Sequence, residues 1–69
     1  MDAREALQQV MRAHGIKQGY VAKQAGLTER KLSDVFCGRR KLDANELFAI
    51  CKAMRITPDE VFRTAEEQT

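Results

Sequence analysis

The sequence predicts an all-helical domain built from five short helices. Two observations carry this prediction. Five helix starts and stops follow one another along the 69 residues, and no stretch alternates apolar and polar residues as a strand would. A chain of this length forms one domain with a modest core. We place the domain at residues 1–64 and a short polar tail, expected to fray, at residues 65–69.

The first helix is expected to open at Asp2. An aspartate followed three residues later by Glu5 has the spacing of a capping box, in which each residue satisfies a free N–H group of the other. The apolar stripe of this helix consists of Leu7, Val10 and Met11. Gly15 ends the helix, because glycine accepts the left-handed conformation that follows many helices.

The second helix is predicted from about Lys17 to Ala25, where Gly26 stops it. Gly19 lies inside this helix and costs about 1 kcal/mol relative to alanine, unless close packing uses the missing side chain. Thr28 is a favourable N-cap for a third helix at 29–36, which Cys37 and Gly38 close. The inward positions of the two helices are Val21, Ala22, Ala25, Leu32, Val35 and Phe36.

The fourth helix begins with a second capping box, Asp43 and Glu46, and its apolar side carries Leu47, Ile50 and Met54. The fifth starts at 57–60, where threonine, proline, aspartate and glutamate combine a cap with a proline in the first turn. Val61 and Phe62 anchor it. We expect Phe48 and Phe62 in the core; the alternative is that one of them belongs to a dimer contact.

Composition excludes several classes of function. Cys37, Cys51 and His14 are at most three soft ligands, whereas a closed zinc site needs four, so we expect no metal and no cofactor. The chain has no Ser/His/Asp or Cys/His set, no glycine-rich phosphate loop and no room for a deep pocket. We therefore predict neither enzymatic activity nor a small-molecule ligand. Without an apolar run of membrane length or a signal sequence, we expect a cytoplasmic protein away from membranes.

Charge is distributed unevenly along the chain. Residues 12–41 contain eight basic and two acidic residues, whereas the remainder contains four basic and eight acidic ones. A basic middle segment between acidic ends suits a polyanion held on one face, although charge alone also fits a solvated mosaic.

The stretch from Gln18 to Arg40 has the plan of a helix-turn-helix. The turn at 25–28 contains Gly26, which permits the tight turn, and the helix after it is the one that enters the major groove in such motifs. From about Val10 to Phe62 the chain resembles the lambda-repressor-like and Cro-like helix-turn-helix proteins, often called the XRE family. The matching residues are Gln18, Val21-Ala22, Gly26-Leu27-Thr28, Leu32-Ser33, Gly38-Arg39-Arg40 and the run 50–62.

This resemblance implies a five-helix lambda-repressor-like fold that binds double-stranded DNA. The base-contacting positions that it implies are Glu29, Arg30, Ser33 and Asp34. The phosphate-contacting positions that it implies are Lys17, Gln18, Tyr20, Lys31, Arg39, Arg40 and Lys41. Arg30 is the best candidate for a specific contact, because a guanidinium pairs bidentately with guanine O6 and N7. For Tyr20 a plain surface role stays open, and for Glu29 and Asp34 helix-start electrostatics stay open.

Three departures from the family pattern stand out. The recognition helix carries two carboxylates, which are unfavourable near phosphates unless they accept from cytosine or orient a neighbouring base. Lys17 stands where relatives often have a capping threonine, so the second helix has a weak start. Met11 and Phe36 stand where many relatives have a buried arginine–glutamate pair, and we expect them to pack together instead.

The resulting hypothesis is a transcription regulator, a repressor of bacterial or phage origin, that binds a palindromic operator as a homodimer. The alternative is a protein-interaction module on the same scaffold, antitoxin-like or antirepressor-like, with weak or no DNA binding. Binding that falls steeply with salt would favour DNA.

Overall fold

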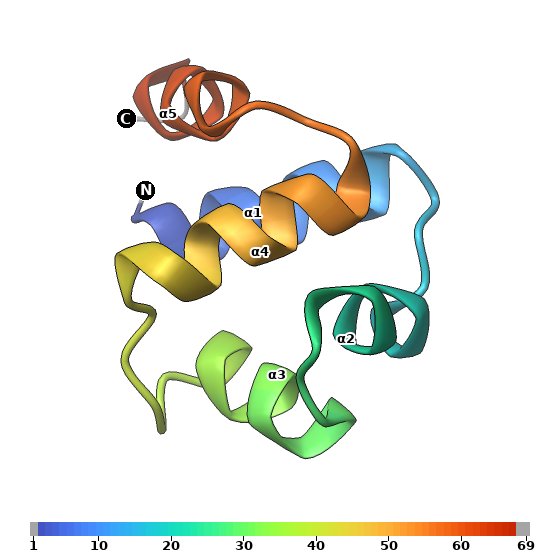
Figure 1. Ribbon diagram of the computed structural model, residues 1–69. Coiled ribbons are helices and arrows are strands. Elements are labelled where there is room, and N and C mark those ends of the chain that lie inside the picture. The colour runs from blue at the N-terminus through green and yellow to red at the C-terminus, as the bar shows by residue number, and fades with distance from the viewer. Residues whose placement is uncertain (1, 68–69) are drawn as a thin grey trace.

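A computed structural model describes residues 2–67 of the chain as five helices joined by short loops (Figure 1). The helices are α1 (Ala3–Ala13), α2 (Gln18–Ala25), α3 (Glu29–Phe36), α4 (Ala44–Met54) and α5 (Pro58–Glu67). Within residues 2–67 there is no strand, so the predicted all-helical fold of five helices is confirmed.

The helix starts follow the capping residues of the sequence. The Asp2 carboxylate accepts the Glu5 N–H at 2.9 Å and the Asp43 carboxylate accepts the Glu46 N–H at 2.7 Å. The hydroxyls of Thr28 and Thr57 accept the N–H three residues on in the same way. Lys17 precedes α2 and makes no such bond. The predicted weak start of α2 is thus confirmed.

Among the described residues, four helix ends use the left-handed conformation: Gly15 and Gly38 follow the C-caps of α1 and α3, and in α2 and α4 the C-cap residue itself is left-handed. Gly26 ends α2 with φ +74°, and its N–H donates to the carbonyls of Ala22 and Lys23. Arg55 ends α4 with φ +58°, although an L side chain is strained in this region. Its N–H donates to the carbonyls of Cys51 and Lys52, so the hydrogen bonding of a glycine cap is reproduced by an arginine.

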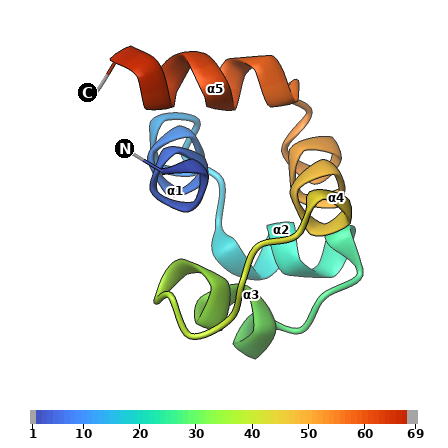
Figure 2. The same cartoon turned by 90° about the vertical axis from the view of Figure 1, so that its left-hand side faces the viewer.

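The helices form two pairs that share one core. In the two views, α5 lies at one end of the molecule and α3 at the opposite end, with α1 and α4 between them (Figures 1 and 2). α5 packs on α1, α2 packs on α4, and α3 is held by α2 and α1. The outer face of α3 is therefore free of every other helix at its end of the molecule.

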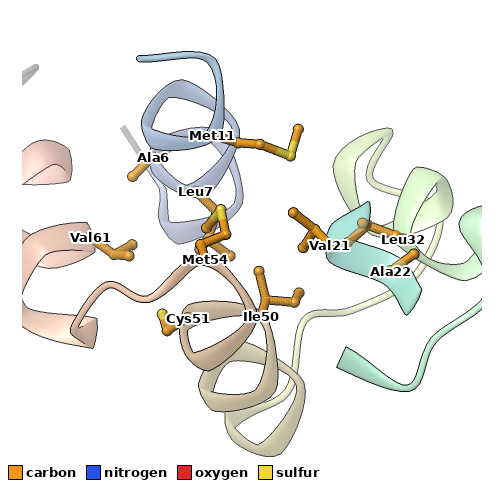
Figure 3. Packing of buried hydrophobic residues seen from close by; sticks show 10 residues of the cluster. All are labelled: Ala6, Leu7, Met11, Val21, Ala22, Leu32, Ile50, Cys51, Met54 and Val61. Atoms are coloured by element: carbon orange, nitrogen blue, oxygen red, sulfur yellow. The ribbon is translucent and has the colours of Figure 1, made fainter. Parts of the chain in front are cut away.

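Side chains from all five helices meet in the core (Figure 3). The buried members are Ala6, Leu7, Met11, Val21, Ala22, Leu32, Ile50, Cys51, Met54 and Val61. Most of the predicted inward positions are buried as expected. Ala25, Phe36 and Leu47 are half-buried and pack against the margin of this cluster.

The prediction that Phe48 and Phe62 belong to the core was wrong. Their exposed fractions are 56% and 53%. Ile50 faces the core, and at about 100° per residue Phe48 lies about 160° around α4 from it, toward the solvent side of the helix. On α5, Val61 occupies the inward position, and its neighbour Phe62 turns toward solvent.

The last helix is longer than the polar composition of its end suggests. α5 continues to Glu67, beyond residue 64 where we placed the end of the domain, and Ala65 packs against the core. Of the expected tail at 65–69, residues 68–69 lie outside the described part of the chain. No helix among residues 2–67 is long and apolar enough to cross a bilayer.

Candidate nucleic-acid interface

The turn between α2 and α3 fixes the direction of α3. The left-handed conformation of Gly26 reverses the chain, and the Leu27 N–H donates to the Ala22 carbonyl at 2.8 Å. Thr28 then caps α3 by accepting the Lys31 N–H at 3.1 Å. Leu32 is fully buried, so its position on α3 determines which side of this helix faces outward.

The first turn of α3 presents three charged side chains to solvent: Glu29, Arg30 and Lys31 are all exposed. Ser33 and Asp34, one turn further along, are half-buried. Within residues 2–67 no carboxylate lies at ion-pair distance from Arg30 or Lys31. These two cations are therefore available to a ligand, and α3, which carries them, lies at one end of the molecule (Figure 2).

Glu29 has a contact that its place in the sequence did not suggest. A Cβ built on Gly19 would lie 3.3 Å from the Glu29 Cδ and would overlap its Oε1. The carboxylate of α3 thus lies against the first turn of α2, where free N–H groups carry partial positive charge. This explains why glycine is tolerated at position 19, and it places a negative charge beside the helix start that lacks a side-chain cap.

Gln18 and Tyr20 occupy different sides of α2. Gln18 is the first helical residue and is half-buried, whereas Tyr20 is 52% exposed. Tyr20 borders a shallow groove of about 270 Å³ that it shares with Lys52 and Arg55 at the end of α4. It therefore lies toward α4, whereas Gly19 faces α3. Lys17 is exposed just before the helix.

The loop after α3 carries the remaining predicted phosphate contacts, and all three are exposed. The N–H groups of Arg39 and Arg40 both donate to the Asp34 carbonyl, at 2.8 and 3.2 Å, which fastens the loop to the end of α3. The Arg40 Nε lies 3.2 Å from the Glu46 Oε2, and Arg39 makes a looser pair, 3.9 Å, with Asp34. Lys41 has no ion pair among residues 2–67.

Glu46 was missed by the sequence analysis except as half of a capping box. Its backbone N–H completes the cap of Asp43, while its side chain, only 10% exposed, holds Arg40. A carboxylate this poorly hydrated needs a partner, so Arg40 supports the loop as well as facing solvent. Nothing in the spacing of residues 40 and 46 indicates this pair, because it depends on how the loop folds back on α4.

The site thus combines an exposed helix start with basic residues on two flanking segments. Arg30 and Lys31 come from α3, Lys17 and Gln18 from the start of α2, and Lys41 from the loop after α3. A helix free on one side, with cations beside it, is an arrangement that fits the major groove of a duplex between its phosphate strands. Among the described residues no cluster of three or more histidine, cysteine or acidic side chains could hold a metal ion.

Comparison with known proteins agrees with this geometry. The sequence profile of the Cro/C1-type HTH DNA-binding domain, where HTH denotes helix-turn-helix, matches residues 6–67. The matched segment includes all of α2 to α5 and most of α1. No curated protein matches the chain.

Proposed function

Since the chain belongs to the family of Cro/C1-type helix-turn-helix DNA-binding domains, and is thus a DNA-binding regulator, we propose that it is a sequence-specific repressor of bacterial or phage origin. In this proposal α3 enters the major groove of an operator, and binding occludes a promoter. Binding rather than catalysis is the activity typical of such domains, and the place of action is the cytoplasm.

The observation that carries the proposal is the exposed first turn of α3. Arg30 is exposed there without a carboxylate partner among residues 2–67, so its guanidinium is available for the O6 and N7 atoms of a guanine. Ser33 extends the base-contacting surface by one turn. The two phosphate strands are held by the predicted phosphate-contacting residues, with Tyr20 at the margin of this set. The other members are Lys17, Gln18, Lys31, Arg39, Arg40 and Lys41.

The two carboxylates of α3 have more specific roles in this proposal. Asp34 pairs loosely with Arg39, so it can orient that guanidinium toward a phosphate as well as accept from cytosine. Glu29 lies against Gly19, and it contacts a base only after its side chain swings away from α2. If Glu29 contacts a base, the start of α2 therefore loses the negative charge that stabilises it.

We further propose that the protein binds as a homodimer. One recognition helix covers too little surface for tight specific binding, and two-fold symmetric operators place half-sites about 34 Å apart. The longest dimension of one protomer is 30 Å, so two protomers fit side by side at this spacing. Phe48 and Phe62, both exposed, are available for such a contact, and Phe62 belongs to α5, which lies at the opposite end of the molecule from α3.

The test is selection of the purified full chain against random duplex DNA, followed by titration of the enriched duplex at two salt concentrations. The proposal expects enrichment of a short inverted repeat that is bound more weakly at higher salt, because phosphate contacts release counterions. A scrambled duplex of the same length and composition is the control for specificity. If no sequence is enriched and no salt-sensitive binding is seen, the result favours the protein-interaction module. Glu29 and Asp34 are then the residues to test.

A further inference from the structure

We propose that Arg4, at the start of α1, joins Arg39 and Lys41 in a groove that binds a phosphate of the DNA backbone beside the recognition helix. This inference rests on the proposed function and adds to it a contact from α1, outside the helix-turn-helix. Arg4 has no part in the site predicted from the sequence.

The groove lies where the start of α1 meets the loop between α3 and α4. It has a volume of about 550 Å³, and its polar lining comes from Asp2, Arg4, Arg39, Arg40 and Lys41. Both views place this loop between α3 and the start of α4 (Figures 1 and 2). The groove therefore opens next to the end of the helix that enters the duplex.

The guanidinium of Arg4 is held in this groove rather than extended into water. A Cβ built on Gly38 would lie 3.4 Å from the Arg4 Cζ and would overlap its Nη1. The Arg4 Nε is buried, and it has no hydrogen-bond partner among the described residues. The one carboxylate partner of Arg4 in residues 2–67 is the exposed Asp2, 3.3 Å from its Nη2. The guanidinium is thus positioned by Gly38 and Asp2, while its buried Nε–H has no partner among the described residues.

Gly38 serves this arrangement in two ways. Its φ of +82° is strained for any L side chain, and its missing Cβ leaves the space that the Arg4 guanidinium occupies. The turn that ends α3 therefore also brings Arg4 close to Arg39 and Lys41, although these residues are far apart in the sequence.

The charges of the groove favour an anion. Lys41 has no ion pair among residues 2–67, and Arg39 has only a 3.9 Å contact with Asp34. Arg40 is engaged by Glu46. Arg4, Arg39 and Lys41 therefore outweigh Asp2. A planar guanidinium with free N–H groups is suited to phosphate oxygens.

The backbone of a bound duplex is the source of phosphate that the position favours. The loop is fastened to α3 through the Asp34 carbonyl, so its orientation follows that of the recognition helix. A helix in the major groove has a phosphate strand on either side. The groove is adjacent to α3 on the side of its last turn, where one of these strands would pass. A small free phosphate compound would use the same chemistry, and the experiment separates the two sources.

The experiment measures how affinity for a mixed-sequence duplex depends on salt, because a backbone contact acts on all sequences. For Arg4→Gln the fall in affinity between 50 and 200 mM salt should be smaller than for the unaltered protein by roughly threefold, the effect of one lost phosphate contact. Arg12→Gln is the matched control. It removes an exposed arginine near the other end of α1 and should leave the salt dependence unchanged.

Two further variants keep the test independent of folding. Arg4→Lys preserves the charge and should retain most of the salt dependence, while Lys41→Gln should reduce it by about the same factor as Arg4→Gln. Urea denaturation identifies a variant that has lost its fold. If Arg4→Gln is unfolded, the salt dependence of Arg4→Lys is compared with that of Lys41→Gln instead.

The outcomes distinguish this inference from the function on which it rests. Full salt dependence in Arg4→Gln, with normal binding by the unaltered protein and reduced salt dependence in Lys41→Gln, overturns the inference alone. Absence of salt-dependent binding by the unaltered protein overturns both. A shift of the Gly38 amide resonance by inorganic pyrophosphate, combined with full salt dependence in Arg4→Gln, assigns the groove to a free anion and overturns the DNA assignment.

Discussion

At the scale of single residues, the first turn of α3 contains neighbours with different roles. Glu29 and Arg30 are both exposed, yet the carboxylate of Glu29 lies against α2 whereas Arg30 has no carboxylate partner among the described residues. Sequence alone predicts that both positions face outward, because Leu32 and Val35 fix the inward face of α3. It does not predict the contact between Glu29 and Gly19, which depends on how closely α2 and α3 cross.

The variant Arg30→Ala should lose about 1–3 kcal/mol of operator affinity and relax preference at one base pair. The reason is the loss of two hydrogen bonds to a base edge, which a wrong base cannot restore. Competition titrations with single-base operator variants measure this. Lys31→Ala is the neighbouring control, expected to weaken binding to all sequences alike. Unchanged discrimination in Arg30→Ala would remove Arg30 from base recognition.

The variant Gly19→Ala tests the contact with Glu29 through stability. Alanine favours a helix interior by about 1 kcal/mol over glycine, but its Cβ displaces the Glu29 carboxylate from the start of α2. We expect Gly19→Ala to stabilise the Glu29→Ala protein by about 1 kcal/mol and the unaltered protein by less. Urea denaturation of the four proteins in a double-mutant cycle gives the coupling. Equal effects in both backgrounds would mean that the contact contributes nothing.

The two cysteines should differ in reactivity and in their effect on stability. Cys37 is exposed, whereas burial, with a smaller contribution from Glu60, raises the pKa of the Cys51 thiol above its ordinary value. Iodoacetamide should therefore modify Cys37 in the native protein and spare Cys51. As pH rises past about 8.5 the unfolded thiol ionises while the native one keeps its proton, so the free energy of unfolding should fall as pH rises further. Cys51→Ala should show a weaker fall over this range.

At the scale of elements, the loop after α3 is fastened at both ends. Asp34 accepts two N–H groups of the loop, and Glu46 on α4 holds Arg40. The sequence predicts the helices on either side well, because caps such as Thr28 and Asp43 act locally. It does not predict the Arg40–Glu46 pair, nor that Arg4 would reach Gly38, because both contacts join segments that only the tertiary fold brings together.

Arg40→Ala should lower the free energy of unfolding by about 1–2 kcal/mol, because it strands a poorly hydrated carboxylate without its charged hydrogen bond. Arg39→Ala should change it by less than about 0.5 kcal/mol, since Arg39 is 78% exposed and its pair spans 3.9 Å. Both variants should weaken DNA binding. Denaturant titration separates them, and equal stability losses would contradict the supporting role of Arg40.

At the scale of the whole molecule, the recognition helix and the last helix occupy opposite ends. The five-helix fold follows from the order of caps and apolar stripes. The exposure of the two phenylalanines does not. Phe48 stands in the apolar run 47–51, which gives no sign of the face it occupies, and Phe62 stands beside Val61, either of which could turn inward. The consequence is that the helix carrying Phe62 lies at the end of the molecule opposite the recognition helix.

A full operator with half-site centres one helical turn apart should therefore be bound more tightly than a duplex with a single half-site, and cooperatively with protein concentration. Adding five base pairs between the half-sites rotates one of them to the far side of the duplex and should remove the cooperativity. Adding ten base pairs, a full turn, returns both half-sites to the same side of the duplex. Titrations of the three duplexes against the single half-site measure this. Equal affinity for all of them would contradict the homodimer.

The left-handed Arg55 bears on how this protein can evolve. An L residue in that conformation costs about 1–2 kcal/mol, most of which a glycine would recover. Natural proteins are commonly only slightly more stable than they need to be. A gain of this size is therefore a large share of the total free energy of unfolding. A lineage that first acquires glycine at position 55 can afterwards accept a destabilising change on α3 and still fold. The end of α4 thus influences how freely the recognition helix can acquire new operator specificities.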